Sequence, residues 1–247
     1  TELYRANCGD NLKICLLADK KGFSSPSKPD DKTDLYAVKK LIGKLNDKYS
    51  GGFILAVRPR VYSKTQNEYT GKDRKRGAIT SLVNAIKGER SAFECLYGDL
   101  ENFENTKFIL ALDADSELPL LAAKGLISAA LHPLNKPVID ENKGKVVSGY
   151  GIFAPCVGTD LAFSSSTFFS SLLSGSGGIT AYDNLTSDRY QDIFGAGIFA
   201  GKGLINVDVF YTLLSDRFKN EKILSHDILE GEFMRTLFVS DVEVADG

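Results

Sequence analysis

Two kinds of hydrophobic pattern alternate along the first half of the chain. Short apolar runs predict buried strands at residues 12–18, 51–60 and 106–116. Apolar residues at helical spacing predict helices at residues 34–48, 79–89 and 118–131. We interpret Asp34 as the N-cap of the first helix and place Pro119 near the first turn of the third. Strands that alternate with helices indicate an α/β fold with a doubly wound, mostly parallel mixed sheet flanked by helices.

The second half of the chain has a weaker pattern. Residues 144–155 predict an exposed or mixed-sheet strand, and residues 163–190 are rich in serine, glycine and aromatic residues. Residues 197–214 run from a glycine-rich loop into a strand or a helix. A helix is predicted over residues 227–238, and a last strand over residues 239–245.

Length, charge and cysteine content exclude several classes of protein. With 247 residues, and no linker rich enough to divide the chain, we expect a single domain over residues 1–247. The net charge of −2 and the 43% hydrophobic content are ordinary for a soluble globular protein and do not favour nucleic-acid binding. No apolar run is long enough to span a bilayer, and no signal peptide opens the chain. Four cysteines without metal-ligand spacing indicate a reducing, cytoplasmic compartment.

Two carboxylates lie at the end of the third predicted strand. Asp113 closes its apolar run and Asp115 begins the turn, while Asp19 and Arg58 lie where the other two apolar runs end. Ligands of open α/β sheets bind beyond the carboxyl ends of the strands, so we expect these polar groups to face one crevice. Paired carboxylates suit Mg²⁺ or Mn²⁺ held together with substrate phosphates. Asp113 and Asp115 are therefore candidate metal ligands, and a polar turn in which Asp115 caps the next helix is the alternative.

A basic cluster precedes the second predicted helix. Arg74, Lys75 and Arg76 oppose the helix macrodipole unless an anion docks there. Helix amides and cations acting together suit a diphosphate. A solvated run of charges is the alternative interpretation.

The helix predicted at residue 227 carries a second pair of carboxylates. Asp227 and Glu230 lie at i, i+3 on one face, next to His226, and Arg235 follows two turns later. A carboxylate in this position can act as general base on a sugar hydroxyl, and Arg235 can reach a phosphate or pair with a carboxylate. The alternative is a capped surface helix with an internal ion pair.

Taken together, these motifs resemble one family. The segments are RPR…GKDRKRG, LDADSELP, HPLNKPV, VVSGYGIFAPCVG, SDRYQDIFGAGIFAGKGLINVDVF and ILSHDILEGEFMR…FVSDVEV. Their order and approximate spacing are those of the glycosyltransferase domain of cyclic β-1,2-glucan synthases (glycosyltransferase family 84), from about Asn11 to Val244. The resemblance implies a GT-A (Rossmann-like) fold, related to processive inverting transferases such as cellulose synthase.

The resemblance also implies ligands and partners. The donor would be UDP-glucose, and the acceptor a growing β-1,2-glucan. Other domains of a large parent synthase would be partners, and that full-length protein would lie at the cytoplasmic face of the bacterial inner membrane. The present chain would be a soluble domain excised from it.

The resemblance also implies roles for individual residues. Asp19 would contact the uridine, and Lys75 or Arg76 would meet the diphosphate. Asp113 and Asp115 would hold UDP and a Mg²⁺ or Mn²⁺ ion. Asp227 would take the proton of the acceptor 2-hydroxyl in a single inverting displacement, with Glu230 as the rival base. Arg235 would bind the nucleotide sugar. The residues that would bind the acceptor are Gly201, Lys202, Gly203, His226 and Glu230.

The chain departs from the relatives in two ways. They place a first strand and a nucleotide-contacting loop upstream of the segment matching residues 11–19, so we expect an edge of the nucleotide pocket to be missing. The QxxRW motif of cellulose synthases is absent from the sequence, and Arg235 is expected to stand in part for it. Two other classes stay open. A nucleotide-sugar nucleotidyltransferase usually needs a glycine-rich signature after its first strand, and a non-catalytic nucleotide-sugar-binding domain would not need these carboxylates.

Overall fold

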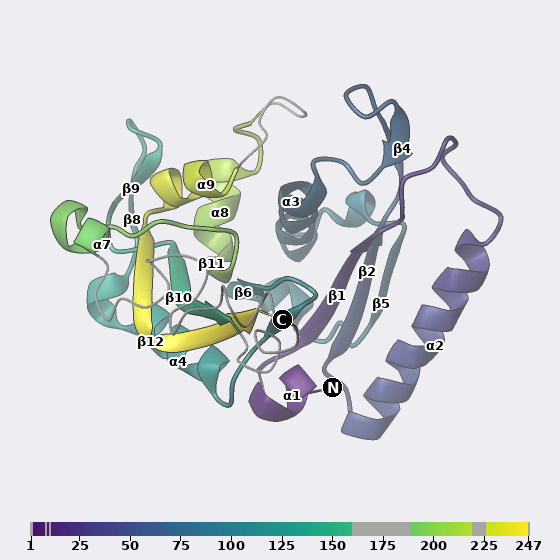
Figure 1. The fold of residues 1–247 in the computed structure, drawn as a ribbon, viewed down its shortest axis with the longest axis horizontal. Coiled ribbons are helices and arrows are strands. Elements are labelled where there is room, and N and C mark those ends of the chain that lie inside the picture. The colour runs from purple at the N-terminus through teal and green to yellow at the C-terminus, as the bar shows by residue number, and fades with distance from the viewer. Residues whose placement is uncertain (1, 8, 10, 160–188, 219–225, 247) are drawn as a thin grey trace, which may run out of the picture. The chain divides into compact units, whose positions relative to one another are not determined.

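The computed structural model of the chain describes residues 2–7, 9, 11–159, 189–218 and 226–246. These residues form a mixed α/β structure with parallel and antiparallel strand pairs (Figure 1). They cluster into two compact units. Unit 1 comprises Thr1–Cys8, Phe108–Leu213 and Asp227–Gly247, and unit 2 comprises Gly9–Lys107 and Leu214–His226. The single domain expected over residues 1–247 stays a prediction, because one domain can contain two such units.

Unit 2 is built on a three-stranded sheet. Its elements are β1 (Ile14–Asp19), α2 (Asp31–Tyr49), β2 (Phe53–Arg58), β3 (Val61–Ser63), β4 (Glu68–Thr70), α3 (Arg74–Ile86), η1 (Arg90–Ala92), β5 (Cys95–Gly98) and η2 (Phe103–Asn105). Strand β1 pairs parallel to β2, and β2 pairs antiparallel to β5. Helices α2 and α3 flank the sheet on opposite sides (Figure 1). The hairpin β3-β4 follows β2.

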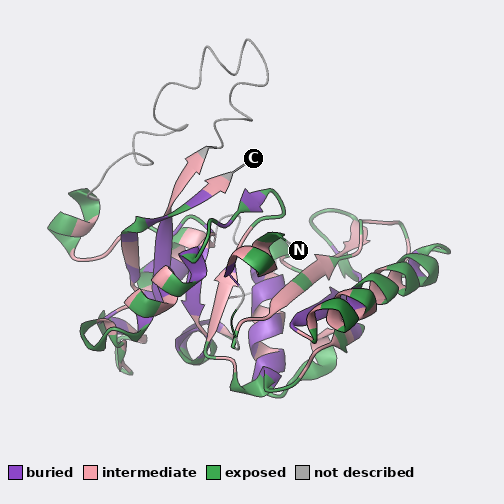
Figure 2. Ribbon diagram, turned by 90° about the horizontal axis from the view of Figure 1, so that it is seen from below, coloured by how far each residue is buried: buried purple, intermediate pink, exposed green. Residues whose placement is uncertain are grey.

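Burial in unit 2 follows position in the sheet. Every residue of the central strand β2 is buried, as its continuous apolar sequence predicts. Strand β1 lies at an edge and leaves Leu16 exposed, so the prediction of a buried first strand holds only in part. Helix α2 begins at Asp31, three residues before the predicted N-cap Asp34. Its described side chains are mostly exposed or half-buried, as Figure 2 shows, with only Asp31 and Ile42 buried.

An ion pair fastens the start of α2 to the chain that follows β2. The Arg60 guanidinium donates to both carboxylate oxygens of Asp31, at 2.5 and 3.0 Å, and to the backbone oxygen of Lys21 at 2.7 Å. The ammonium of Lys20 lies 3.7 Å from the same carboxylate. The hydrogen bond from Arg60, followed by that from the Lys28 amide, holds the pKa of Asp31 well below its usual range. Folding therefore favours the ionised carboxylate.

We expect Asp31→Asn to lower the free energy of unfolding at pH 7 and to lose this effect in acid. The folded pKa is depressed, so the stabilisation is present above the unfolded pKa of about 3.9 and fades as the pH falls below it. Urea unfolding at pH 7, 5 and 3 measures the difference between wild type and variant. The exposed Asp34→Asn on the same helix is the control. A difference for Asp31→Asn that stays constant down to pH 3 would contradict the ion-pair explanation.

Unit 1 is built on a five-stranded sheet with the order β6-β11-β10-β12-β7. Its elements are α1 (Glu2–Asn7), β6 (Phe108–Ala111), β7 (Ser116–Glu117), α4 (Ala122–Leu131), η3 (Pro133–Asn135), β8 (Val138–Asp140), β9 (Lys145–Ser148), β10 (Ile152–Thr159), α7 (Arg189–Phe194), β11 (Gly203–Asn206), α8 (Val207–Leu214), α9 (Asp227–Met234) and β12 (Thr236–Asp246). Helix α4 packs against β10 and β12, and β8 and β9 form a hairpin. The core of the unit includes the fully buried Phe153, Phe199 and Phe210.

The mixed α/β class is confirmed, but the prediction of a mostly parallel sheet is wrong. Among the described strands, β1-β2 and β10-β12 pair in parallel, and the remaining pairs are antiparallel. Alternating strands and helices imply parallel neighbours only when successive strands pair. Here β6 pairs with β11, far along the chain, and a local pattern cannot show that pairing.

Several predicted element boundaries also change. The strand predicted over residues 144–155 divides into β9 and β10 at a turn. Helix α4 begins at Ala122, later than the predicted start at residue 118, and Pro119 lies just before it. Helix α9 ends before Arg235, whose φ of 60° lies in the left-handed region, so β12 begins earlier than predicted. The segment 163–190, for which no clear pattern was found, lies mostly outside the described residues.

Candidate active site

The first carboxylate of the DAD motif lies beside the glycine-rich loop that precedes β11. Strands β6 and β11 are antiparallel with Gly203 opposite Ala111, so the chain after β6 runs beside the chain before β11. The Lys202 ammonium lies 3.4 Å from Oδ2 of Asp113, and the Lys202 side chain is only 12% exposed. The Asp113 amide donates to Oγ of Ser116 at 3.2 Å, which orders the turn. The structure therefore brings together two residues that the family resemblance assigned to different substrates.

The same loop also lies against Asp227. Gly201 has a φ of 87°, which strains any other residue, and a Cβ built on it would lie 3.1 Å from Oδ2 of Asp227. Asp227 is the first residue of α9 and is half-buried. The helix macrodipole stabilises a carboxylate in this position. The loop over Gly201, Lys202 and Gly203 thus pairs with Asp113 through Lys202 and lies beside Asp227 at Gly201, all within unit 1.

The rival carboxylate of α9 is buried. Glu230 lies one turn after Asp227 and is 2% exposed. Of the two side chains, Asp227 is therefore the one that a ligand from solvent can reach. His226 precedes α9, and its ring centroid is 6.5 Å from that of Phe218, in unit 2.

In unit 2, Asp19 and Arg58 end neighbouring parallel strands in register. The Arg58 Nε and Nη2 atoms donate to the two Asp19 carboxylate oxygens at 2.7 and 2.5 Å. Its Nη1 and Nη2 atoms also donate to the backbone oxygens of Lys72 at 2.8 Å and Arg74 at 3.0 Å. Arg58, only 4% exposed, therefore anchors the basic loop to Asp19. The sequence placed Arg58 at a strand end, and the structure adds this anchoring role.

The basic residues before α3 divide into an exposed one and a buried one. Lys75 is exposed, whereas Arg76 is buried with its guanidinium 4.6 Å from the centroid of the Phe218 ring. Asp73 and Arg74 have φ values of 55° and 46°, a strained conformation that clusters at ligand-binding sites. Lys75 is thus the more accessible of the two cations predicted to meet a diphosphate.

The candidate metal ligands Asp113 and Asp115 lie on the exposed turn between β6 and β7. In the part of the chain that the structure describes, no group of three or more histidine, cysteine, aspartate or glutamate side chains is placed to hold a metal ion. Two carboxylates nevertheless fit Mg²⁺ or Mn²⁺ when substrate phosphates supply further oxygens. The position of the Lys202 ammonium beside Asp113 indicates that this carboxylate attracts a cation.

Arg235 lies at a separate pocket. Its Nη2 donates to the backbone oxygen of Gly195 at 2.7 Å, and its Nη1 to that of Val147 at 3.3 Å. Its guanidinium lies 5.1 Å from the centroid of the Tyr150 ring. Both ends of the guanidinium fork thus contact backbone carbonyls, and the predicted contact of Arg235 with the nucleotide sugar stays a prediction.

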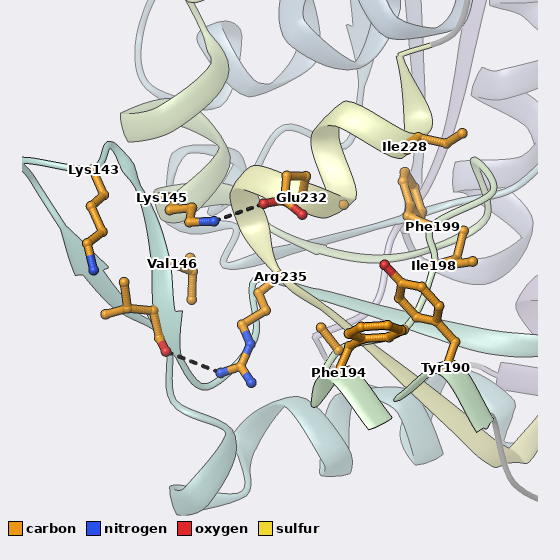
Figure 3. Close-up of a pocket in the computed structure, with 14 residues that line it drawn as sticks. Lys143, Lys145, Val146, Tyr190, Phe194, Ile198, Phe199, Ile228, Glu232 and Arg235 are labelled. Atoms are coloured by element: carbon orange, nitrogen blue, oxygen red, sulfur yellow. Dashed lines mark hydrogen bonds and ion pairs between the residues drawn. The ribbon is translucent and has the colours of Figure 1, made fainter. Parts of the chain in front are cut away.

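The pocket beside Arg235 has a volume of about 500 Å³ and lies within unit 1 (Figure 3). Its lining includes Tyr190 and Phe194 of α7 together with Glu232 of α9. None of the sequence motifs predicted this pocket. The available signal was the i, i+4 spacing of the two aromatic residues in RYQDIF.

Comparison with known proteins identifies relatives of the chain. No family model matches it. It is 33% identical over 248 residues to the cyclic beta-(1,2)-glucan synthase NdvB of Rhizobium meliloti (strain 1021), a match that covers 98% of the chain and 9% of the synthase. The resemblance that the sequence motifs predicted is thereby confirmed, while the assignment to glycosyltransferase family 84 stays a prediction. The chain is therefore similar to one segment of a cyclic β-(1,2)-glucan synthase and spans 9% of the length of that relative.

Proposed function

We propose that the chain is an inverting glucosyltransferase domain that moves glucose from UDP-glucose onto a growing β-1,2-glucan. One observation supports the proposal most strongly: within unit 1, the Lys202 ammonium lies 3.4 Å from the Asp113 carboxylate, and Gly201 lies beside Asp227. The proposed diphosphate ligand and the proposed base thus lie next to the same glycine-rich backbone. The mixed α/β structure is compatible with the proposed GT-A fold.

Asp227 acts as general base in this proposal. Its carboxylate accepts the proton of the acceptor 2-hydroxyl while that oxygen attacks C1 of the donor glucose. The bond between C1 and the UDP oxygen breaks, and UDP leaves with the electron pair. A single in-line displacement converts the α-linked donor into a β-linked product. Gly201 lets the loop lie close to Asp227, whereas Gly203 is required by packing, since a Cβ there would lie 2.7 Å from the backbone oxygen of Phe153.

Negative charge develops on the diphosphate as UDP leaves, and positively charged groups must stabilise it. Asp113 and Asp115 would hold a Mg²⁺ or Mn²⁺ ion, which neutralises charge on the phosphates when it is bound. Within unit 1, Lys202 adds a cation beside Asp113. Within unit 2, Lys75 is proposed to bind a phosphate oxygen, and Asp19, held by Arg58, is proposed to contact the uridine.

The partners proposed for the chain are the other domains of a synthase at the cytoplasmic face of the bacterial inner membrane. The relative's length supports this, because the chain matches only 9% of it. Among the described residues, no helix is both long enough and apolar enough to cross a membrane. No specific observation favours a nucleotidyltransferase or a non-catalytic binding domain.

We expect Lys75→Ala to weaken UDP binding by on the order of 1.5–3 kcal/mol, because it removes a charge-assisted contact. Since Lys75 is exposed, the thermal unfolding midpoint should stay unchanged. Arg76→Ala should instead also lower this midpoint, because it removes a buried guanidinium that stacks on Phe218. Calorimetry with UDP measures both variants, with the exposed Lys40→Ala on α2 as control. If Lys75→Ala binds UDP with normal affinity, the basic cluster does not bind the diphosphate and is a solvated run of charges.

Donor selectivity tests the proposed function. The chain should bind UDP-glucose saturably in the presence of Mn²⁺ and should bind ADP-glucose and GDP-mannose more weakly. Competition calorimetry against UDP measures the three affinities. Equal affinity for all three, or no binding of UDP-glucose, would contradict the proposed donor.

A further inference from the structure

The pocket beside Arg235 has walls of two different chemistries. Tyr190 and Phe194 form one wall, with ring centroids 4.6 Å apart and exposed fractions of 41% and 65%. Lys145 and Glu232, joined by an ion pair of 2.8 Å, form another. Figure 3 shows the aromatic pair and the charged pair on different sides of the pocket. Such a surface matches a ligand that is apolar on one face and rich in hydroxyl groups at its edge.

The cations of the pocket are engaged by groups of the protein itself. Lys145 pairs with Glu232, and Lys143 lies 3.8 Å from a carboxylate oxygen of Asp140. Arg235 donates to two backbone carbonyls. Hydroxyl groups of a ligand can use the remaining donors and acceptors of Lys145 and Glu232 without separating their ion pair. Together with the exposed aromatic wall, these paired charges fit a neutral polyhydroxylated ligand.

The pocket adjoins the elements that carry the proposed base. Helix α9 begins with Asp227 and contributes Ile228 and Glu232 to the pocket. The chain over residues 197–199 lines the pocket and then leads to Gly201, which lies against Asp227. One loop and one helix thus connect the pocket to the base within unit 1.

From these features we propose that the pocket is a glucan-binding subsite, which holds sugar units of the β-1,2-glucan behind its reacting end. The inference rests on the proposed function, since it assigns this pocket to the acceptor of the same reaction. The C–H face of a glucosyl ring packs against Tyr190 and Phe194, and its hydroxyls bond to Glu232 and Lys145. The pocket volume of about 500 Å³ lies within the range of about 300–1,000 Å³ that small-molecule sites occupy. The subsite keeps the growing chain bound between successive additions.

Titration of the chain with β-1,2-linked glucooligosaccharides tests the subsite. We expect saturable binding that Tyr190→Ala and Phe194→Ala each weaken at least about 5-fold, because each removes a stacking surface. The matched control is Ile193→Ala, which lies on the same helix, is 74% exposed and does not line the pocket. Phe194→Leu keeps an apolar side chain without the ring, so weakened binding with an unchanged melting temperature separates loss of stacking from loss of fold. UDP affinity should be the same in all four variants.

Two results would overturn the subsite. One is the absence of saturable oligosaccharide binding by the wild type, and the other is binding that both aromatic alanine variants retain. The UDP titration distinguishes this failure from that of the proposed function. A wild type that binds UDP but no glucan contradicts the subsite alone, whereas a wild type that does not bind UDP contradicts the transferase itself.

Discussion

Replacing Asp227 by asparagine in the full-length protein is expected to lower glucosyl transfer from UDP-glucose at least about 100-fold. The amide keeps the shape of the side chain but cannot accept the proton of the acceptor hydroxyl. UDP affinity should stay within a few-fold, because the proposed base does not bind the nucleotide. The measurement combines glucan synthesis in membranes with UDP binding to the chain.

Glu230→Gln is the matched comparison, since Glu230 lies on the same helix but is 2% exposed. A buried carboxylate cannot readily receive a proton from an acceptor that enters from solvent, so this variant should retain more transfer activity than Asp227→Asn. Thermal melting of both variants separates loss of catalysis from loss of fold. Near-normal synthesis by Asp227→Asn together with an inactive, folded Glu230→Gln would move the base to Glu230.

The second large effect is expected at the DAD motif. Mn²⁺ or Mg²⁺ should strengthen UDP binding, and Asp115→Ala should remove this dependence on the metal. Asp115 lies on an exposed turn, where a carboxylate can share an ion with substrate phosphates. The readout is the UDP affinity measured by calorimetry with Mn²⁺ and with EDTA.

The control for the metal experiment is Glu117→Ala, an exposed carboxylate two residues further along the same turn and strand. It should leave the metal dependence unchanged. Equal UDP affinity of the wild type with Mn²⁺ and with EDTA would exclude a metal-assisted UDP site at Asp113 and Asp115. Transfer would then need another source of positive charge, for which Lys202 is the nearest candidate.

Local hydrophobic patterns predicted where several helices and strands lie along the chain. The helical spacing of apolar residues located α2, α3 and α4, and the apolar runs located β1, β2 and β6. The hydrophobic pattern did not locate β5 or β7, which are four and two residues long. Sheet order could not be predicted either, because the pairing of β6 with β11 joins distant segments.

In the candidate site too, the sequence predicted individual residues but not the contacts that join distant segments. The motifs predicted Asp113 as a metal ligand and Asp227 as the base. They could not predict the ion pair of Asp113 with Lys202, because it depends on the register of β6 with β11. The burial of Arg76 depends on Phe218, which is remote in the sequence. Arg235 was predicted to bind the nucleotide sugar. The backbone carbonyls that it contacts, of Val147 in β9 and of Gly195 after α7, are remote in sequence, and the helical pattern of α9 does not reveal them.

The most direct test of the proposed transferase is to follow the anomeric carbon of UDP-glucose during synthesis by the full-length protein. With donor labelled by ¹³C at C1, NMR should show loss of the α-linked donor signal, release of UDP and growth of β-1,2-linked glucosyl signals. The Asp227→Asn variant should show none of these changes on the same timescale. An α-linked product, or β-1,2-glucan formed at the wild-type rate by the variant, would contradict single displacement with Asp227 as base.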